Sequence, residues 1–126
     1  MKVSYKFFKE YPATRILIGK LMEASYPSVK SSYGIKKMID VLGKEFEIYI
    51  DLLKDKEGII KWNEDKKIVN PDEVKEVFDE LHAHEFDVEF GPLTSDELKA
   101  LRHVSPKELE LLQMISDPTA FDSLLT

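Results

Sequence analysis

One stretch without proline, from Val29 to Lys56, constrains the fold of this chain more than any other feature. Its apolar residues stand three or four positions apart or side by side, which places them in one stripe along an α-helix. They are Ile35, Met38, Ile39, Leu42, Phe46, Tyr49, Ile50 and Leu53. Such a helix is about 40 Å long, longer than a domain of this size is wide. We therefore expect a spine against which other segments lay apolar faces.

Length and composition favour one domain over residues 1–126. The apolar fraction of 43% is enough for a hydrophobic core. No apolar run reaches the length of a membrane span, and the first residues lack the apolar stretch of a signal peptide. The chain has no cysteine, which excludes disulfides, thiolate catalysis and cysteine-based zinc sites. We therefore expect a cytoplasmic protein without a membrane segment.

Four short segments have the pattern of strands. Residues 2–8 and 85–90 alternate apolar and polar side chains, and 59–62 with 66–69 indicate a hairpin with a polar tip. A small antiparallel sheet built from these four segments is expected. Between the first strand and the spine, Pro12 precedes a helix over 13–24.

Three helix starts share one local chemistry. Asn70, Thr94 and Ser105 each stand three residues before a glutamate, which is the spacing of a capping box. The helix after Asn70 carries four apolar residues on one side and four acids on the other, and we expect it to pack antiparallel on the spine. The apolar side is Val74, Val77, Phe78 and Leu81, and the acidic side is Asp72, Glu76, Asp79 and Glu80.

The other two predicted helices run from Ser95 to Leu101 and from Pro106 to about Ile115, the last with Leu109, Leu112 and Ile115 as anchors. The segment 116–126 is expected to be a loose tail unless Phe121 and Leu124 dock. The predicted fold is therefore α+β and mostly helical, with the long helix in an antiparallel helical hairpin beside a small antiparallel sheet.

Charge is distributed unevenly along the chain. The formal net charge is −6, and residues 70–100 alone hold ten acids and two lysines. A concentrated field of one sign steers association with an oppositely charged partner. The acids and one aromatic of the predicted hairpin form the predicted partner-binding set: Glu76, Asp79, Glu80, Glu85, Asp87, Glu89 and Trp62. The N-terminal lysines are mixed with acids, so direct nucleic-acid binding is not expected.

His82, His84 and Glu85 are the only cluster of metal-ligand types. Two histidines at this spacing diverge on a helix, and at a helix end they are favoured by the dipole, so we interpret them as structural, with a metal site as the alternative. His103 is isolated. No phosphate-binding glycine motif occurs, and no cofactor and no catalytic set is predicted.

The runs YPSVKSSYGIKKMIDVL, VKEVFDELHAHEFDVEFGPL and SPKELELLQMI, in this order, resemble a family of small tailed-bacteriophage proteins filed as a domain of unknown function. The resemblance covers about residues 16–115. It implies a viral product working in the host bacterial cytoplasm, and it supplies no activity and no functional residue.

Taken together, these features predict a non-enzymatic phage accessory protein that binds and modulates a host protein of defence or transcription through its acidic surface. Two alternatives stay open. One is a virion assembly chaperone or minor structural protein, with self-association through the long helix. The other is a small metal-dependent enzyme at His82 and His84.

Overall fold

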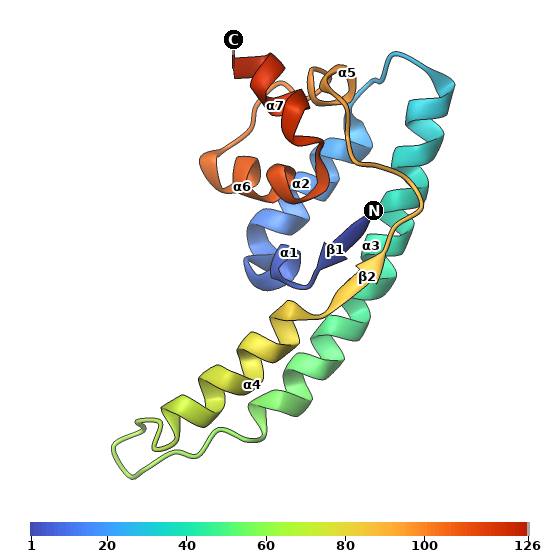
Figure 1. Cartoon of the computed structure of the whole chain (residues 1–126). Coiled ribbons are helices and arrows are strands. Elements are labelled where there is room, and N and C mark those ends of the chain that lie inside the picture. The colour runs from blue at the N-terminus through green and yellow to red at the C-terminus, as the bar shows by residue number, and fades with distance from the viewer. Residues whose placement is uncertain (126) are drawn as a thin grey trace.

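The computed structural model describes residues 1–125, which are mostly helical with one small antiparallel sheet, as the sequence predicts (Figure 1). The elements in chain order are β1 (Lys2–Ser4), α1 (Lys6–Lys9), α2 (Tyr11–Glu23), α3 (Val29–Glu57), α4 (Pro71–Ala83), β2 (Glu85–Asp87), α5 (Ser95–Leu98), α6 (Pro106–Ile115) and α7 (Pro118–Leu125).

Helix α3 is the predicted spine and runs unbroken from Val29 to Glu57. Its first turn is capped by Ser28, because the Ser28 hydroxyl accepts a hydrogen bond from the backbone N–H of Ser31 at 3.1 Å. The buried residues of α3 end at Tyr49: they are Gly34, Ile35, Met38, Ile39, Leu42 and Tyr49. Buried residues are therefore confined to the first two-thirds of the spine.

The remainder of α3 leaves the body of the protein and pairs with α4, which runs back antiparallel as predicted (Figure 1). We call residues 50–80 the arm and the other described residues the head. No residue of the arm is buried. Within the described chain, no helix is both long enough and apolar enough to cross a bilayer.

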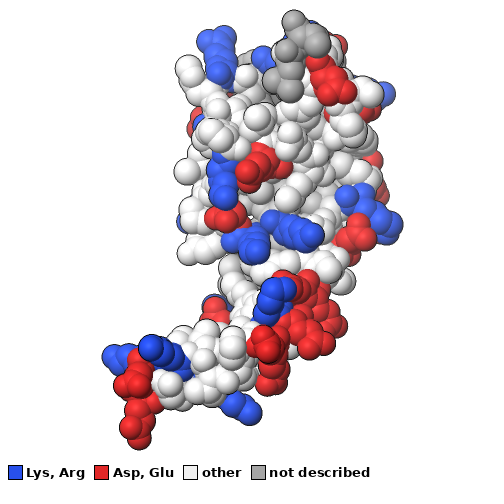
Figure 2. Space-filling model, turned by 60° about the vertical axis from the view of Figure 1, so that its left-hand side comes forward, with Lys and Arg blue, Asp and Glu red and all other residues white. Residues whose placement is uncertain are grey.

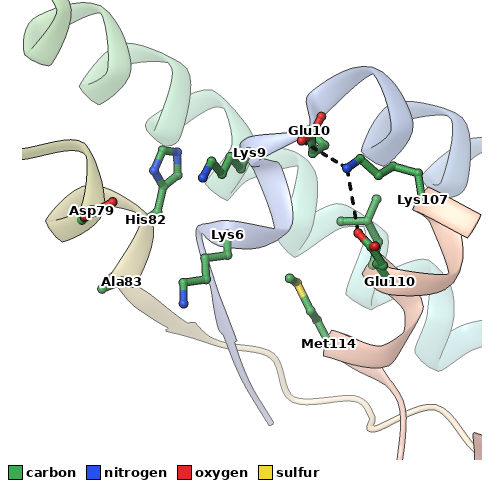
Figure 3. A pocket seen from close by; sticks show the side chains of 10 residues that line it. Lys6, Lys9, Glu10, Asp79, His82, Ala83, Lys107, Glu110 and Met114 are labelled. Carbon is green, nitrogen blue, oxygen red and sulfur yellow. Dashed lines mark ion pairs between the residues drawn. The ribbon is translucent and has the colours of Figure 1, made fainter. Parts of the chain in front are cut away.

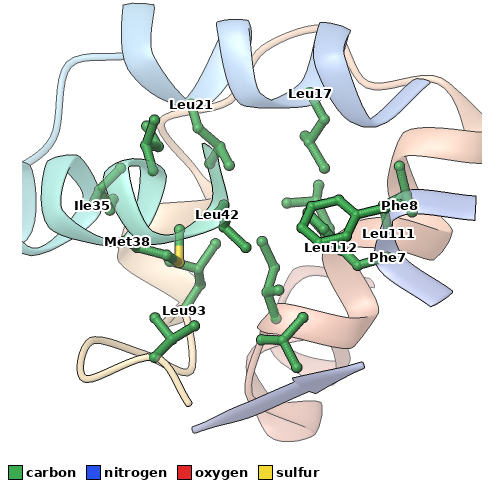
Figure 4. Packing of buried hydrophobic residues seen from close by; sticks show 14 of the residues in the cluster. Phe7, Phe8, Leu17, Leu21, Ile35, Met38, Leu42, Leu93, Leu111 and Leu112 are labelled. Carbon is green, nitrogen blue, oxygen red and sulfur yellow. The ribbon is translucent and has the colours of Figure 1, made fainter. Parts of the chain in front are cut away.

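The core lies in the head, where side chains of α2, α3 and α6 converge (Figure 4). Phe8 of α1 stacks on Phe86 of β2 with ring centroids 5.8 Å apart and planes 4° apart. Each such aromatic buries a large apolar surface, and truncating one to alanine typically costs about 3–5 kcal/mol. The short elements α1 and β2, far apart in the chain, are therefore held by the same cluster as the spine.

The predicted four-stranded sheet is wrong. The sheet has two strands, β1 and β2, in antiparallel register with Val3 opposite Phe86. The predicted strand 2–8 stops at Ser4, and α1 follows. Phe7 and Phe8 are both fully buried, and neighbouring residues of a strand point to opposite faces, so a helical turn inserts both rings into the core where a two-faced strand could not.

The predicted hairpin at 59–62 and 66–69 is reduced to one bridge between Trp62 and Ile68. The Asn63 side chain organises the turn instead, since its Oδ1 accepts hydrogen bonds from the backbone N–H groups of Asp65 and Lys67. Every residue from Lys61 to Val69 is exposed. A two-stranded ribbon without a packed face is marginally stable, which explains why no longer ladder forms.

Asn70 does not cap α4 in the predicted way. Its Oδ1 accepts the backbone N–H of Lys61 at 3.0 Å, and its Nδ2 donates to the carbonyl of Ile59 at 3.0 Å and to Glu73 at 3.1 Å. Asn70 therefore ties both sides of the loop at the arm tip to the start of α4.

The other two capping boxes are confirmed, with both reciprocal hydrogen bonds at Thr94–Glu97 and at Ser105–Glu108. Glu108 is buried and also pairs with Lys20 of α2. Burial acts to raise the pKa of the Glu108 carboxyl, but the hydrogen bonds from Lys20 and Ser105 outweigh it and hold that pKa below its usual range. The capping residue Glu108 therefore also joins α6 to α2 through its ion pair with Lys20.

The end of the described chain is not loose. α7 follows α6 directly, and the backbone of Leu93 bonds to Ile115 and Asp117, which brings the loop before α5 against the α6–α7 junction. Phe121 is buried, while Leu124 is 37% exposed. Two details also differ from the prediction: α5 ends at Leu98, and Leu109 is exposed because Leu111 takes its predicted place in the core.

Phe90 departs from the predicted alternation because β2 ends at Asp87. The ring of Phe90 lies flat against Gly34 of α3, where a Cβ atom would stand 2.1 Å from Cδ2 and 2.7 Å from Cγ of the ring. Gly34 therefore forms a notch that admits Phe90, whereas Gly43 on the same helix is exposed, with nothing within 4 Å of the same position.

We predict opposite effects for Gly34→Ala and Gly43→Ala. Alanine at position 43 should raise the free energy of unfolding by about 1 kcal/mol through helix propensity alone. Alanine at position 34 should lower it by about 1–2 kcal/mol, because the Cγ contact forces the Phe90 backbone to shift. Urea unfolding of the two variants measures the difference, and equal stabilisation by both would contradict the notch.

Candidate interaction surface

The arm is a two-helix hairpin that projects from the head (Figures 1 and 2). Its inner contacts come from half-buried residues such as Leu53 of α3 with Val77 and Phe78 of α4. Because no third element covers this pair, the arm exposes its outer faces and its tip to any partner. Ion pairs and steric fit, not a deep cleft, would determine what it contacts.

The outer face of α4 is acidic. The 3.6-residue period places its acids opposite Val74, Phe78 and Leu81, and every one of these acids is exposed. We call them the α4 acidic face: Asp72, Glu73, Glu76, Asp79 and Glu80. Acidic side chains gather on the arm just below the head in Figure 2.

Ion pairs divide the predicted acids into two groups. Asp79 pairs with Lys75 at 2.6 Å, and Asp87 pairs with Lys2 across the sheet at 3.3 Å. The hydrogen bond from Lys75 lowers the pKa of the Asp79 carboxyl, with the charge of Lys9 acting in the same direction. The remaining predicted acids make no ion pair within residues 1–125, so their charge is free for a partner: Glu76, Glu80, Glu85 and Glu89.

The structure does not unite all the predicted residues in one patch. Glu76, Asp79 and Glu80 share the α4 face, and Glu85 follows α4 at the start of β2. Asp87 and Glu89 instead line a separate groove of about 640 Å³ beside α3, where Lys30 and Lys37 stand among the lining residues. Lysines therefore share this groove with Asp87 and Glu89, and the α4 face is the more strongly negative surface.

Trp62 lies in the loop at the far end of the arm and is 60% exposed. Ile68, its bridge partner, and Val69 are also exposed, so the tip presents three large apolar side chains. An exposed tryptophan with apolar neighbours has the composition of an interface anchor. This residue and the α4 face belong to the same projecting unit.

His82 and His84, the alternative metal site, have separate environments. His82 is buried, and its Nε2 lies 2.9 Å from the Tyr49 hydroxyl. Burial lowers the pKa of His82, against a hydrogen bond to the Phe78 backbone that raises it, and the Lys9 charge lowers it further. The Tyr49 hydroxyl therefore occupies Nε2 of the buried ring.

His84 is exposed, and its ring packs against that of Tyr5 at a centroid distance of 4.9 Å with the planes tilted by 53°. His103 is exposed on the loop before α6. Across residues 1–125 no three His, Cys, Asp or Glu side chains are grouped so that they could hold a metal ion. The geometry therefore gives the metal alternative no ligand set.

Sequence reasoning missed a hollow between α1, α4 and α6, seen in Figure 3, where Lys6, Lys9, His82 and Met114 face a common space. Lys6 fell within the predicted strand 2–8 and Lys9 directly after it, so their approach to α4 had no local signal. Only the helical turn at α1 turns both lysines toward the end of α4.

Comparison with models of known protein families, with curated proteins and with solved structures gives no match. The resemblance to small tailed-phage proteins therefore stays a prediction from the sequence.

His82 should make stability depend on pH. Because its folded pKa is lowered, the unfolded state binds a proton first as pH falls, so stability should decline from about pH 7 toward the folded pKa. His82→Gln, which keeps an acceptor for Tyr49, should reduce this decline, and the exposed control His103→Gln should not. Urea unfolding at pH 7 and pH 5 measures the decline in the free energy of unfolding. An unchanged decline in His82→Gln would contradict its assignment to His82.

Proposed function

We propose that this chain is a non-enzymatic interaction protein whose arm binds a basic protein partner. The observation that carries the proposal is the arm itself: residues 50–80 contain no buried side chain, yet they continue a helix that is anchored in the head. A segment of this size that does little to fill its own core has its surface available for another molecule.

Charge supports a basic partner. Glu76 and Glu80 stand on the exposed face of α4 without an ion pair in the described chain, and Glu85 continues the negative surface toward the head. Such a surface speeds association with a positively charged partner and disfavours negatively charged ones. The same charges argue against nucleic acid, whose phosphates they would repel.

The apolar tip supports a protein over a small molecule as the partner. Trp62, Ile68 and Val69 are exposed side by side at the end of the arm. Buried aromatic anchors surrounded by polar contacts provide much of the binding energy of protein interfaces. The acidic face would steer the partner, and the tip would provide the contact that holds it.

The sequence resemblance to tailed-phage proteins extends the proposal to a partner from the host bacterium, a component of defence or transcription.

A second candidate function is an assembly factor of the virion that associates with itself. The observation favouring it is that α3 past Tyr49 has no buried residue and packs only with α4 in the arm, so the arm is the part of the spine left for a helical seam. Mass spectrometry of purified particles separates the two functions.

Charge reversal on α4 tests the acidic face. Glu76→Lys with Glu80→Lys should abolish capture of the partner from bacterial lysate, because these acids carry unpaired charge. The matched control is Glu23→Lys with Asp96→Lys, two exposed acids of the head without ion pairs. Capture by the wild type should weaken at high salt, where exposed charges are screened. Identical capture by both double variants would remove the acidic face from the proposal.

Substitution of Trp62 tests whether the tip of the arm binds the partner. Trp62→Ala should weaken partner binding by about 2 kcal/mol or more if the indole is an anchor, while unfolding free energy stays within about 0.5 kcal/mol because the side chain is exposed. Tyr33→Ala, at an aromatic 59% exposed on the head, is the control. Trp62 is the only tryptophan, so its fluorescence should shift to shorter wavelength on binding. Unchanged affinity and fluorescence would contradict a role for the tip.

A further inference from the structure

The hollow between α1, α4 and α6 has the size of a ligand site. Its volume is about 520 Å³, within the range of pockets that bind small organic molecules. The three elements come from the beginning, middle and end of the chain, and their side chains face one another across the space (Figure 3). The hollow is separate from the outer face of α4, with Asp79 at the boundary between them.

Each carboxylate that lines the hollow already has a lysine neighbour. Glu10 and Glu110 both lie beside Lys107, with Nζ–O distances of 3.4 and 3.9 Å. Asp79 is paired with Lys75. The two glutamates share one lysine, so one negative charge of that group is not neutralised, but no ion pair joins any of these acids to Lys6 or Lys9.

Lys6 and Lys9 are the charges that remain. Within residues 1–125 neither ammonium group makes an ion pair or a hydrogen bond, not even to the carbonyls at the end of α4. Both charges act on His82, where they oppose protonation of the imidazole. His82 itself is held neutral by burial, so it adds no charge to compete with them. The lysine side of the hollow is thus positive and unpaired.

The opposite wall is partly apolar. Leu111 is buried at the base, and Met114 is 43% exposed toward the space in Figure 3. Methionine is flexible and adapts to ligands of different shape. An inorganic anion would gain nothing from this wall, whereas an anion with a hydrocarbon part would contact both sides.

We propose that this hollow binds a small organic anion, a carboxylate on a short apolar body, with Lys6 and Lys9 holding the carboxylate and Met114 contacting the apolar part. The site does not depend on the proposed partner of the arm. It requires only the head, and its ligand chemistry is opposite in charge to the partner expected at the α4 face.

Titration of the full chain with sodium hexanoate, followed by amide NMR, tests the site. Signals of α1, the end of α4 and α6 should shift in a saturable way, and inorganic phosphate should bind more weakly because it lacks the apolar part. Hexylamine, with the same chain and the opposite charge, should cause no shifts there. The pKa of His82, followed through its ring protons, should rise when the anion offsets the charges of Lys6 and Lys9.

Lys6→Gln with Lys9→Gln should weaken hexanoate binding by about tenfold, the effect of two partly exposed charge pairs. Lys44→Gln is the matched control, an exposed lysine of α3 that makes no ion pair and lies outside the hollow. Equal binding by both variants, equal shifts with phosphate, or no saturable shifts with hexanoate would each overturn the proposal. If the double variant lost stability and the protein showed no response to hexanoate, the role of Lys6 and Lys9 would instead be to stabilise the end of α4.

Discussion

The packing of the first two-thirds of α3 into the head is the constraint on which the rest of the structure depends. Ile35, Met38 and Leu42 are almost completely buried, and they fix the direction of a helix that is longer than the head can cover. The surplus length has to emerge, and α4 returns along it because its own apolar side needs a partner. The protein therefore divides into a head and an arm because α3 is longer than the core of the head that covers it.

Much of this was readable in the sequence, because it depends on local chemistry. The spine, its Ser28 cap and the two capping boxes at Thr94 and Ser105 follow from spacing within a few residues. The errors came where tertiary contacts decide. Phe7 and Phe8 enter the core together, so α1 replaces a strand, and the predicted hairpin around Trp62 is reduced to one bridge because nothing packs on it.

The same division applies to the surfaces. The acids of α4 were predictable as an exposed face, since a helical period separates them from Val74, Phe78 and Leu81. The ion pair of Asp87 on β2 was not predictable, because its partner Lys2 comes from a distant strand. The lysine hollow was out of reach for the same reason: its walls are α1, α4 and α6, and no sequence spacing relates them.

The arm is also held in a defined direction, which matters for any role in binding. α3 contains no proline, and a sharp kink in a helix almost always requires proline, a glycine–serine pair or a bulge. At the far end, Asn70 bonds to both sides of the loop and to Glu73, so the tip is tied to the start of α4. A partner that met Trp62 and the α4 face would find them already arranged, and the entropy lost in ordering them on binding would be small. A thin, largely solvent-exposed hairpin can therefore serve as a recognition element, because one continuous helix anchors it in the core of the head.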